Sequence, residues 1–447
     1  RIALAERTVT CVILPKDVQE LAYEEPPRKH DTVHTSVGYV PPIVVPSAAE
    51  LERAAEVLNA GEKVAILVGA GAMGADFEIA QIANTLGAGV AKALLGRAVI
   101  ADDLPFVTGA IGLLGTRPSW DMMQGCDTLL VVGSSFPYSE FLPKEGQARG
   151  VQIDIDPKVI GMRYPMELNL VGDAKATLAA LTPLLLQKPH GAWRKSIEDG
   201  IQSWWDLTKK RAFTEAKPIN PQRLFWELSP RLPVDCMITA DSGSTANWFA
   251  RDLRMKPTMT ATLSGGLATM GCGVPYAIAG KFAHSERVAI ACVGDGAMQM
   301  NGMAELLTVV RYWKEWRDPR FVVIVMNNGD LNMVTWEMRV MAGDTRYEAS
   351  QDLPAFNYAA FADLIGLRGI RVETPDAIAP ALDQAFLSDR PVVVDVVVDP
   401  NVPPLPPHIT FEQAKSFMMS VVKGDPERGG YIRQALENMF PSLAQKP

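Results

Sequence analysis

A carboxylate and an amide follow two apolar stretches in a way that could bind a metal ion. Residues 288–293 and 321–326 are continuous apolar runs, typical of buried parallel strands. Asp295 follows the first run in a Gly-Asp-Gly turn, and Asn328 follows the second in Asn-Asn-Gly-Asp. Both side chains would then lie at the carboxyl ends of parallel strands, where open α/β sheets bind ligands. Carboxylate and amide oxygens are hard ligands suited to Mg²⁺ or Ca²⁺, and Mg²⁺ commonly completes its shell with phosphate oxygens and water.

The glycines beside Asp295 are consistent with a bound phosphate. Gly294 and Gly296 would let a diphosphate approach the backbone and the start of the following helix. A Gly-Asp-Gly turn alone is also an ordinary turn between a strand and a helix. The combination is more specific, because residues 297–326 separate this turn from an Asn pair at the end of a second buried strand.

The paired motifs resemble the thiamine diphosphate motif of the pyruvate oxidase and acetohydroxyacid synthase family. The resemblance implies that Asp295 and Asn328 ligate Mg²⁺ through their side chains, and Asp330 through its main-chain carbonyl. One departure is Asn332, where family members usually have glycine; it could alter the turn but removes no ligand. The resemblance also implies cofactor contacts from the neighbours of these ligands: Gly294, Gly296, Ala297 and Leu331.

Two glycine-containing turns match the same family. Asp241, Gly243 and Ser244 follow the apolar run 237–240, and small hydroxyl residues at a helix start suit either a phosphate or a simple N-cap. In the segment 264–271, the resemblance places Gly265 and Gly266 against the aminopyrimidine of the cofactor. It makes Leu267 the apolar prop that bends the cofactor, although a leucine alone would more often be core packing.

The helix expected after Asn328 carries the proposed substrate contacts. By resemblance, Met333 and Val334 line the pocket and Glu337 faces the substrate. On residue type alone, Glu337 is an ordinary solvated helix carboxylate. Trp336 keeps an acetohydroxyacid synthase-like carboligase open as an alternative to the oxidase.

An earlier segment contains a nucleotide-type glycine motif. Residues 69–74, GAGAMG, follow the apolar run 64–68 and match G-x-G-x-x-G. The next expected strand lacks the acidic residue that a standard NAD site needs, and Lys92 and Arg97 occur there instead. The segment resembles the central domain of pyruvate oxidase-type enzymes, which carries FAD. A domain that keeps this fold without a flavin is the alternative.

The resemblance also names individual flavin contacts. Gly69 and Gly71 would approach the cofactor, Gly109 and Gly112 would pass near the flavin, and Asp154 or Asp156 would lie at its adenosine end. Relatives have Arg where this chain has Leu95, so Arg97 is the candidate to substitute for it.

Strands alternate with helices through most of the chain, which predicts an α/β protein with two doubly wound parallel sheets. The first would be a Rossmann-like, FAD-type domain and the second a thiamine diphosphate-binding fold. The predicted organisation is a remnant of an N-terminal pyrimidine-binding domain (1–24), a Pro-rich linker (25–46), the central domain (47–182), a second linker (183–219), the diphosphate-binding domain (220–400) and a tail (401–447). Residues 8–14 are predicted to form one buried strand of the first part.

Composition excludes several functions. The net charge is −8 and no basic cluster occurs, which argues against nucleic acid as a partner. The five cysteines are scattered and lie mostly in apolar runs, as reduced thiols of a cytosolic protein do. We find no signal peptide and no apolar run long enough to span a bilayer, and therefore expect a cytoplasmic location.

Together these features predict an enzyme that uses thiamine diphosphate, Mg²⁺ and FAD. It would decarboxylate a 2-oxo acid such as pyruvate and pass electrons to FAD and then to quinone or O₂. The alternatives are a carboligase with a structural flavin and a non-catalytic scaffold. Since the family's catalytic glutamate lies in the N-terminal domain, we expect this chain alone to be inactive. We also expect a homodimer or homotetramer.

The segments PPHI (406–409) and EQAKSF (412–417) resemble the tail of quinone-linked pyruvate dehydrogenase, whose C-terminal segment binds membrane. Its last helix would carry Ile432, Leu436, Met439 and Phe440 on one side. Docking of this helix onto its own protein is preferred over peripheral contact with the inner face of the membrane.

Overall fold

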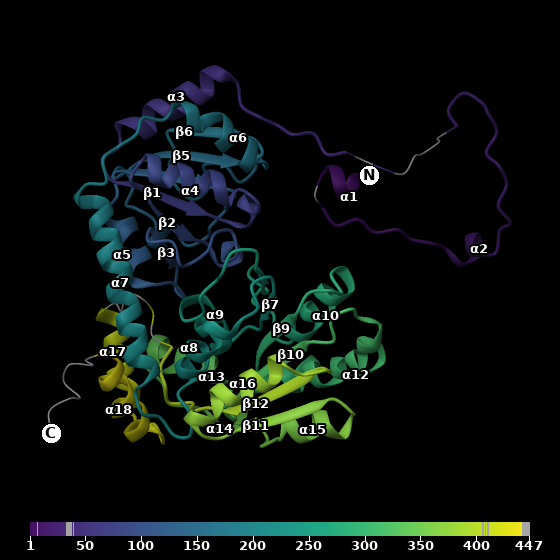
Figure 1. The fold of residues 1–447 in the computed structure, drawn as a ribbon, viewed down its shortest axis with the longest axis vertical. Helices are drawn as coiled ribbons and strands as arrows, with labels where there is room; N and C mark the ends of the chain where they lie inside the picture. Colours follow the sequence, from purple (N-terminus) through teal and green to yellow (C-terminus); the bar gives the residue numbers. More distant parts are fainter. Residues whose placement is uncertain are drawn as a thin grey trace.

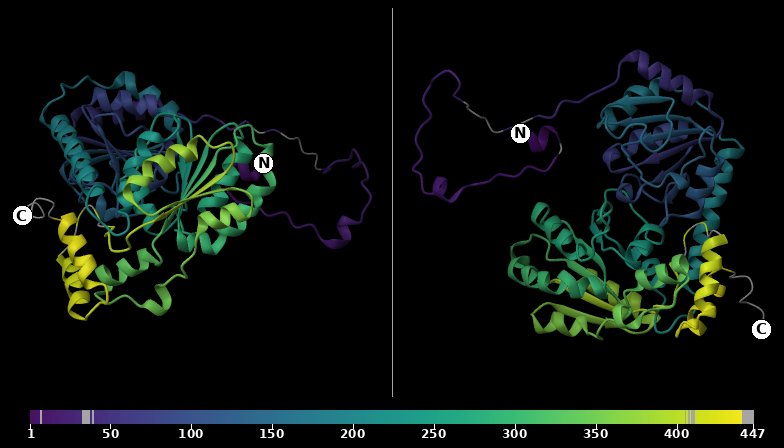
Figure 2. Two further views of the ribbon diagram at one scale, coloured as in Figure 1. Left: turned by 60° about the horizontal axis from the view of Figure 1, so that its bottom comes forward. Right: turned by 180° about the vertical axis from the view of Figure 1, so that it is seen from behind.

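The computed structural model describes residues 1–6, 8–32, 38, 40–404, 406, 408 and 411–439. Two α/β units follow each other along the chain. The described part of residues 1–43, with the short helices α1 (Ile2–Ala5) and α2 (Lys16–Gln19), extends away from both (Figure 1), and the carbonyl of Val44 accepts the N–H of Asp173 in the first unit. Figure 2 shows the same arrangement from two further sides. Within the described residues, no helix has the length and apolar character needed to cross a membrane.

The strand predicted at residues 8–14 is absent, and this prediction is wrong. These residues have no regular secondary structure, and their side chains are exposed. An apolar run becomes a strand only where the edge of a sheet accepts its backbone groups, and in this structure the segment lies against no sheet.

The first unit is a six-stranded parallel sheet with the strand order β3-β2-β1-β4-β5-β6. The strands are β1 (Val64–Val68), β2 (Gly89–Lys92), β3 (Val107–Ala110), β4 (Thr128–Val132), β5 (Arg149–Asp154) and β6 (Leu168–Val171). The helices are α3 (Ala48–Ala60), α4 (Asp76–Thr85), α5 (Arg117–Gly125), α6 (Ala174–Leu181) and α7 (Ala192–Ala212).

Burial explains this sheet. Both β1 and β4 are apolar and buried along their whole length, and they pair in register from Val64↔Thr128 to Val68↔Val132. Side chains of α3, α4 and α6 form the core on one face, and those of α5 and α7 pack on the other. Ser47 caps α3 through a capping box with Glu50. Helix α7 lies within the segment predicted as a linker.

The second unit is also a six-stranded parallel sheet, with the order β11-β12-β10-β9-β7-β8. Its strands are β7 (Met237–Ala240), β8 (Thr260–Thr262), β9 (Ala289–Gly294), β10 (Phe321–Asn327), β11 (Arg368–Val372) and β12 (Val392–Val397). Its helices are α8 (Pro221–Arg231), α9 (Ser244–Arg251), α10 (Gly273–Ala283), α11 (Asp295–Ala297), α12 (Met303–Tyr312), α13 (Asn332–Glu337), α14 (Glu348–Gln351), α15 (Tyr358–Leu364) and α16 (Ile378–Phe386).

The two faces of this sheet are covered by different helices. Helices α8, α9 and α16 pack on one face, and α10, α12 and α15 pack on the other. The prediction of two doubly wound α/β units is therefore confirmed.

A buried ion cluster joins the two units. Asp102 of the first unit pairs with Lys92 at 2.5 Å and with Arg97 at 3.0 Å, and all three side chains are almost fully buried. Arg97 also donates to the carbonyl of Leu253, and the Asp102 carboxylate accepts the backbone N–H of Met255 at 2.8 Å. Burial lowers the pKa of Lys92 to about 7, although Asp102 opposes this shift.

The tail folds back onto the second unit. Helices α17 (Phe411–Val422) and α18 (Arg428–Met439) follow the second sheet, and α17 packs beside residues 338–342 (Figure 1). Of the predicted apolar face of the last helix, Ile432 is half-buried. The side chains of Leu436 and Met439, and all of Phe440, lie outside the described residues.

Candidate active site

The predicted site residues of the second unit gather at the carboxyl ends of β7, β9 and β10. In its strand order, the chain reverses direction across the sheet between β7 and β9. Such a switch point leaves a crevice at the carboxyl ends of the strands, which is where doubly wound sheets bind ligands. The turns after β7 and β9 meet there, because a Cβ on Gly294 would lie 3.6 Å from the hydroxyl oxygen of Thr245.

Asp295 stands at the centre of this site. One carboxylate oxygen accepts the backbone N–H groups of Asn328 at 2.8 Å and Gly329 at 2.6 Å. The other accepts the N–H of Gly296 at 2.9 Å. The side chain is almost fully buried. These bonds tie the turn after β9 to the turn after β10, so the structure brings the predicted ligands Asp295 and Asn328 together.

Asp330 offers its backbone to the site, because its side chain is occupied elsewhere. The carboxylate accepts the Thr335 hydroxyl at 2.9 Å and the Asn332 amide at 3.2 Å, and it pairs with Arg346 at 3.2 Å. Among the described residues, no donor reaches its main-chain carbonyl. The carbonyl is thus without a hydrogen-bond donor there, and its role as a metal ligand stays a prediction. Asn332, the departure from the family pattern, begins α13 and also donates to the carbonyl of Pro400.

The chemistry of these donors fits a divalent cation. Burial raises the pKa of Asp295 to about 6, more than its three backbone hydrogen bonds lower it. No arginine, lysine or histidine pairs with this carboxylate in the described part of the chain. No group of three His, Cys, Asp or Glu side chains that could hold a metal ion exists in the described part either, so a metal here would depend on the amide and carbonyl oxygens as well. A hard cation would supply the missing positive charge.

Mg²⁺ affinity should therefore depend on pH through Asp295. In the metal-free protein its pKa, about 6, lies above the ordinary value of 3.8, so a proton competes with the metal as the pH falls. We expect the affinity for Mg²⁺ to be constant above this pKa and to fall by about tenfold per pH unit below it. Titration calorimetry with Mg²⁺ alone measures this, since a diphosphate would itself titrate in the same range. An affinity unchanged down to pH 4.5, about a pH unit or more below the pKa, would contradict the assignment.

The turn after β7 presents a helix start to the same crevice. Gly243 has φ +98°, a conformation that favours glycine, and directly precedes Ser244 at the start of α9. No side chain caps this helix, so its first N–H groups remain available to an anion. The Asp241 carboxylate, predicted to bind the cofactor, instead accepts the N–H groups of Ser242, Gly271 and Gly273 at 2.7–2.9 Å. Asp241 therefore ties the turn after β7 to residues 271–273 through hydrogen bonds.

The other predicted contacts differ in how far they are covered. Leu331 packs against Gly296, since a Cβ there would lie 2.8 Å from its side chain, and Ala297 is buried. The sulfur of Met333 accepts the Asn247 amide at 3.4 Å. Five predicted contact residues of this unit are exposed: Leu267, which is 90% exposed, Gly265, Gly266, Val334 and Glu337. Gly265 lies beside Leu95 of the first unit.

Two supporting residues were not predicted. Asp395 is fully buried within β12 and accepts hydrogen bonds from the Asn327 amide, the Tyr358 backbone and Arg371. The Tyr358 hydroxyl in turn donates to the carbonyl of Asp295 at 3.1 Å. The sequence contained a signal for Asp395, because it is a single carboxylate within the otherwise apolar run 392–398. A charge buried in this way needs hydrogen-bond partners.

The glycines of the first unit have a packing role. A Cβ on Gly69 would lie 2.4 Å from the carbonyl oxygen of Gly133. A Cβ on Gly71 would lie 2.8 Å from the Cα of Gly133. Gly71 also donates to the Gly133 carbonyl at 3.0 Å. The loops after β1 and β4 therefore need glycine to touch each other, whether or not a flavin binds.

The other residues predicted to contact a flavin have different local roles in the structure. The Arg97 guanidinium is buried in the ion cluster at the junction of the units, and its contact with a flavin stays a prediction. Asp154 and Asp156 each accept a backbone N–H from two residues further along, which shapes the turn after β5. Gly109 and Gly112 have φ +97° and +108°.

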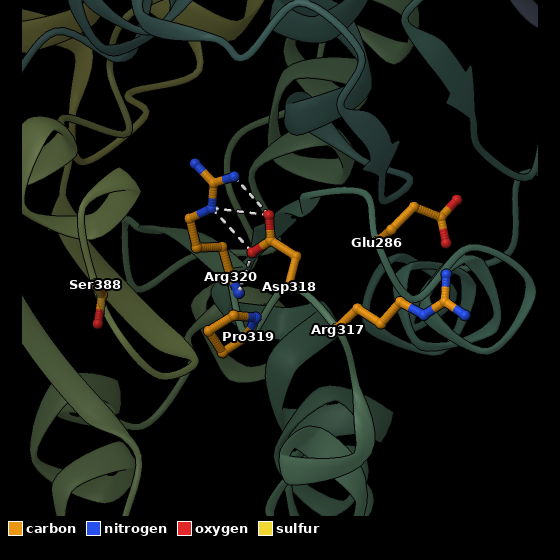
Figure 3. A pocket seen from close by; sticks show the side chains of 6 residues that line it. All are labelled: Glu286, Arg317, Asp318, Pro319, Arg320 and Ser388. Carbon is orange, nitrogen blue, oxygen red and sulfur yellow. Dashed lines mark hydrogen bonds and ion pairs between the residues drawn. The ribbon is translucent and has the colours of Figure 1, made fainter.

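The hollow drawn in Figure 3 is separate from this site. It has a volume of about 430 Å³. It lies at the amino-terminal ends of β9 and β10, whereas Asp295 lies at the carboxyl end of β9. Asp318 and Arg320 pair with each other across it at 2.5 Å. Its lining consists of Glu286, Arg317, Asp318, Pro319, Arg320 and Ser388.

Comparison with known proteins assigns both units to one family. Residues 51–181 match the model described as thiamine pyrophosphate enzyme, central domain. Residues 241–396 match that described as thiamine pyrophosphate enzyme, C-terminal TPP binding domain.

Similar proteins carry related names. A Bacillus subtilis protein named as thiamine pyrophosphate-containing is 34% identical over 416 residues, covering 92% of this chain and 70% of that protein. A Methanocaldococcus jannaschii protein named as an acetolactate synthase large subunit is 30% identical over 417 residues, covering 88% and 67%. The pyruvate oxidase of Lactiplantibacillus plantarum is 24% identical over 403 residues, covering 89% and 65%. The chain thus spans 65–70% of the length of these three relatives.

Proposed function

The chain belongs to the thiamine pyrophosphate enzymes, and from this premise we propose that it holds thiamine diphosphate and Mg²⁺ and acts on a 2-oxo acid such as pyruvate. The buried Asp295 carboxylate carries the proposal, since it lies at the switch point without a cationic partner among the described residues. When bound, thiamine diphosphate supplies the carbanion chemistry by which a 2-oxo acid loses CO₂.

The residues of this chain would bind and orient the cofactor. Asp295 and Asn328 would hold the metal with their side-chain oxygens and Asp330 with its carbonyl. The free N–H groups at the start of α9 would bind the diphosphate. Glu337, exposed at the end of α13, would face the substrate.

A binding experiment tests this core of the proposal. Thiamine diphosphate is titrated into the protein with and without Mg²⁺, and thiamine lacking the diphosphate serves as the control ligand. We expect binding that requires both the metal and the diphosphate, because Asp295, Asn328 and Asp330 would hold a metal whose charge would attract the diphosphate. Binding of thiamine with equal affinity would show that the diphosphate site is absent.

We further propose that electrons pass to FAD in the first unit and then to quinone or O₂. Support comes from the similarity to the Lactiplantibacillus plantarum pyruvate oxidase. The second candidate is a carboligase in which any flavin is structural, and the similarity to proteins named as acetolactate synthases favours it.

The flavin spectrum distinguishes these candidates. Pyruvate is added without oxygen to protein loaded with thiamine diphosphate and Mg²⁺. Bleaching of the visible flavin band supports electron transfer, and a yellow protein that stays yellow supports the carboligase. A colourless protein would contradict the flavin proposal.

A second subunit is also part of the proposal. Leu267, Val334 and Glu337 are predicted cofactor or substrate contacts, yet all three are exposed. We propose that a homodimer or homotetramer covers them, and that the protein is cytoplasmic. A homogeneous monomer in analytical ultracentrifugation, with thiamine diphosphate and Mg²⁺ bound, would contradict the oligomer.

A further inference from the structure

Buried charges connect the tail to the second unit. Asp425 lies between α17 and α18, and its carboxylate binds the guanidinium of Arg339 in a two-point arrangement, with both distances 3.0 Å. Neither side chain is exposed. Arg339 also pairs with Glu427 at 2.9 Å and stacks over the ring of Tyr431 at 4.3 Å. Paired, planar contacts of this kind hold both partners in one geometry.

Arg346 extends these contacts from the tail to the metal turn. Its backbone N–H donates to Asp425 at 2.9 Å, and its guanidinium pairs with Glu427 at 3.0 Å. The same guanidinium pairs with Asp330 at 3.2 Å and with Asp352. One side chain thus spans the tail and the turn after β10.

Asp330 belongs to the turn that holds Asp295. Residues 329–331 are fixed from the other side by a short antiparallel bridge, in which Leu331 donates to Gln351 at 2.8 Å and Leu353 donates to Gly329 at 3.0 Å. The N–H of Gly329 in turn binds the Asp295 carboxylate. Displacement of Asp330 would therefore displace both the carbonyl and the N–H groups that line the metal site.

We propose that Arg346 is a positioning residue for the metal site, and that the docked tail, through Asp425 and Glu427, is what holds Arg346 in place. This inference rests on the proposed Mg²⁺ and thiamine diphosphate site. It makes the tail segment 425–427 a component of cofactor binding although it supplies no ligand.

Charge alone predicts the opposite behaviour. Asp330, Asp352, Asp425 and Glu427 contribute four negative charges, and Arg339 and Arg346 contribute two positive ones. Removal of Arg346 would make the surroundings of the metal more negative, which by electrostatics should strengthen the binding of a cation. A positioning role predicts weaker binding, so the sign of the effect decides between them.

The test compares Arg346→Gln with the unchanged protein by Mg²⁺ titration. Partners that orient ligands typically change metal affinity by about 10 to 100-fold, and we expect a decrease in that range. Arg346→Lys should recover part of the loss, because lysine keeps the positive charge but lacks the planar guanidinium that binds several carboxylates at once. The matched control is Lys423→Gln, which removes the tail's contact with Asp344 and should leave the affinity unchanged. Unchanged or tighter binding by Arg346→Gln would overturn the proposal.

A second readout does not need the metal. In the metal-free protein, hydrogen exchange at the amides of Leu331 and Leu353 should become faster in Arg346→Gln and in the milder Glu427→Gln. If the unchanged protein does not bind Mg²⁺, the proposed function fails while the exchange result still tests the positioning. Protection at both amides equal to that of the unchanged protein would reject the role of Arg346.

Discussion

Asp295→Asn should weaken Mg²⁺ binding by at least about a hundredfold, a larger loss than second-sphere changes produce. The substitution removes the negative charge, which sits buried where a cation would need it. An asparagine must also turn its NH₂ group toward a backbone donor, either that of Gly296 or those of Asn328 and Gly329. The turns would then separate slightly. Isothermal titration with Mg²⁺ measures the loss, and titration with thiamine diphosphate should show a parallel loss.

The metal-free Asp295→Asn protein should remain folded. Loss of a hydrogen bond costs about 1 kcal/mol, but the substitution also relieves the burial of a charge, whose raised pKa shows that the fold disfavours it. Asp318→Asn is the matched control, since Asp318 pairs with Arg320 just before the amino-terminal end of β10, away from the metal site. Equal Mg²⁺ affinity in Asp295→Asn and Asp318→Asn would remove Asp295 from the site.

Asp102→Asn should lower the free energy of unfolding by about 3 to 5 kcal/mol. Asp102 is the carboxylate between Lys92 and Arg97. Its loss leaves the buried Arg97 cation without its partner and lowers the pKa of Lys92 further, so that Lys92 loses its proton. The bond to the Met255 backbone would weaken as well, so the contact between the two units should loosen. Urea unfolding followed by tryptophan fluorescence measures the change, and the two units should separate into distinct transitions.

Asp103→Asn is the matched control for this variant. Asp103 is the next residue along the chain and is exposed. Its substitution should change the free energy of unfolding by no more than about 0.5 kcal/mol. Similar stability losses in the two variants would mean that the cluster does not hold the units together.

The fold was largely predictable because its strands are buried on both faces. Such strands form apolar runs, and β1 and β7 have the bounds that these runs indicate. By contrast, β3 and β8 are short and contain Gly or Thr, so no run marks them. The strand predicted at residues 8–14 was wrong for a different reason. The apolar run is present in the sequence, but in this structure it lies against no sheet.

The site was predictable where its residues are local to strand ends. Asp295 and Asn328 follow apolar runs, and the position of those runs places them together. Arg97 could not be placed in this way, because its partner Leu253 lies 156 positions away. Arg346 was missed for the same reason, since its partners Asp425 and Glu427 are 79 and 81 positions away. Sequence spacing carries no information about such distant contacts.

The contact of Gly69 and Gly71 with Gly133 bears on how nucleotide-binding proteins are recognised in genomes. Packing alone keeps side chains out of these positions. A lineage that lost its dinucleotide would keep the glycines for as long as the two loops touched. Search profiles built on glycine spacing would therefore go on selecting such descendants. Profiles that also score the ligand-facing charged positions would separate cofactor users from domains that retain only the architecture.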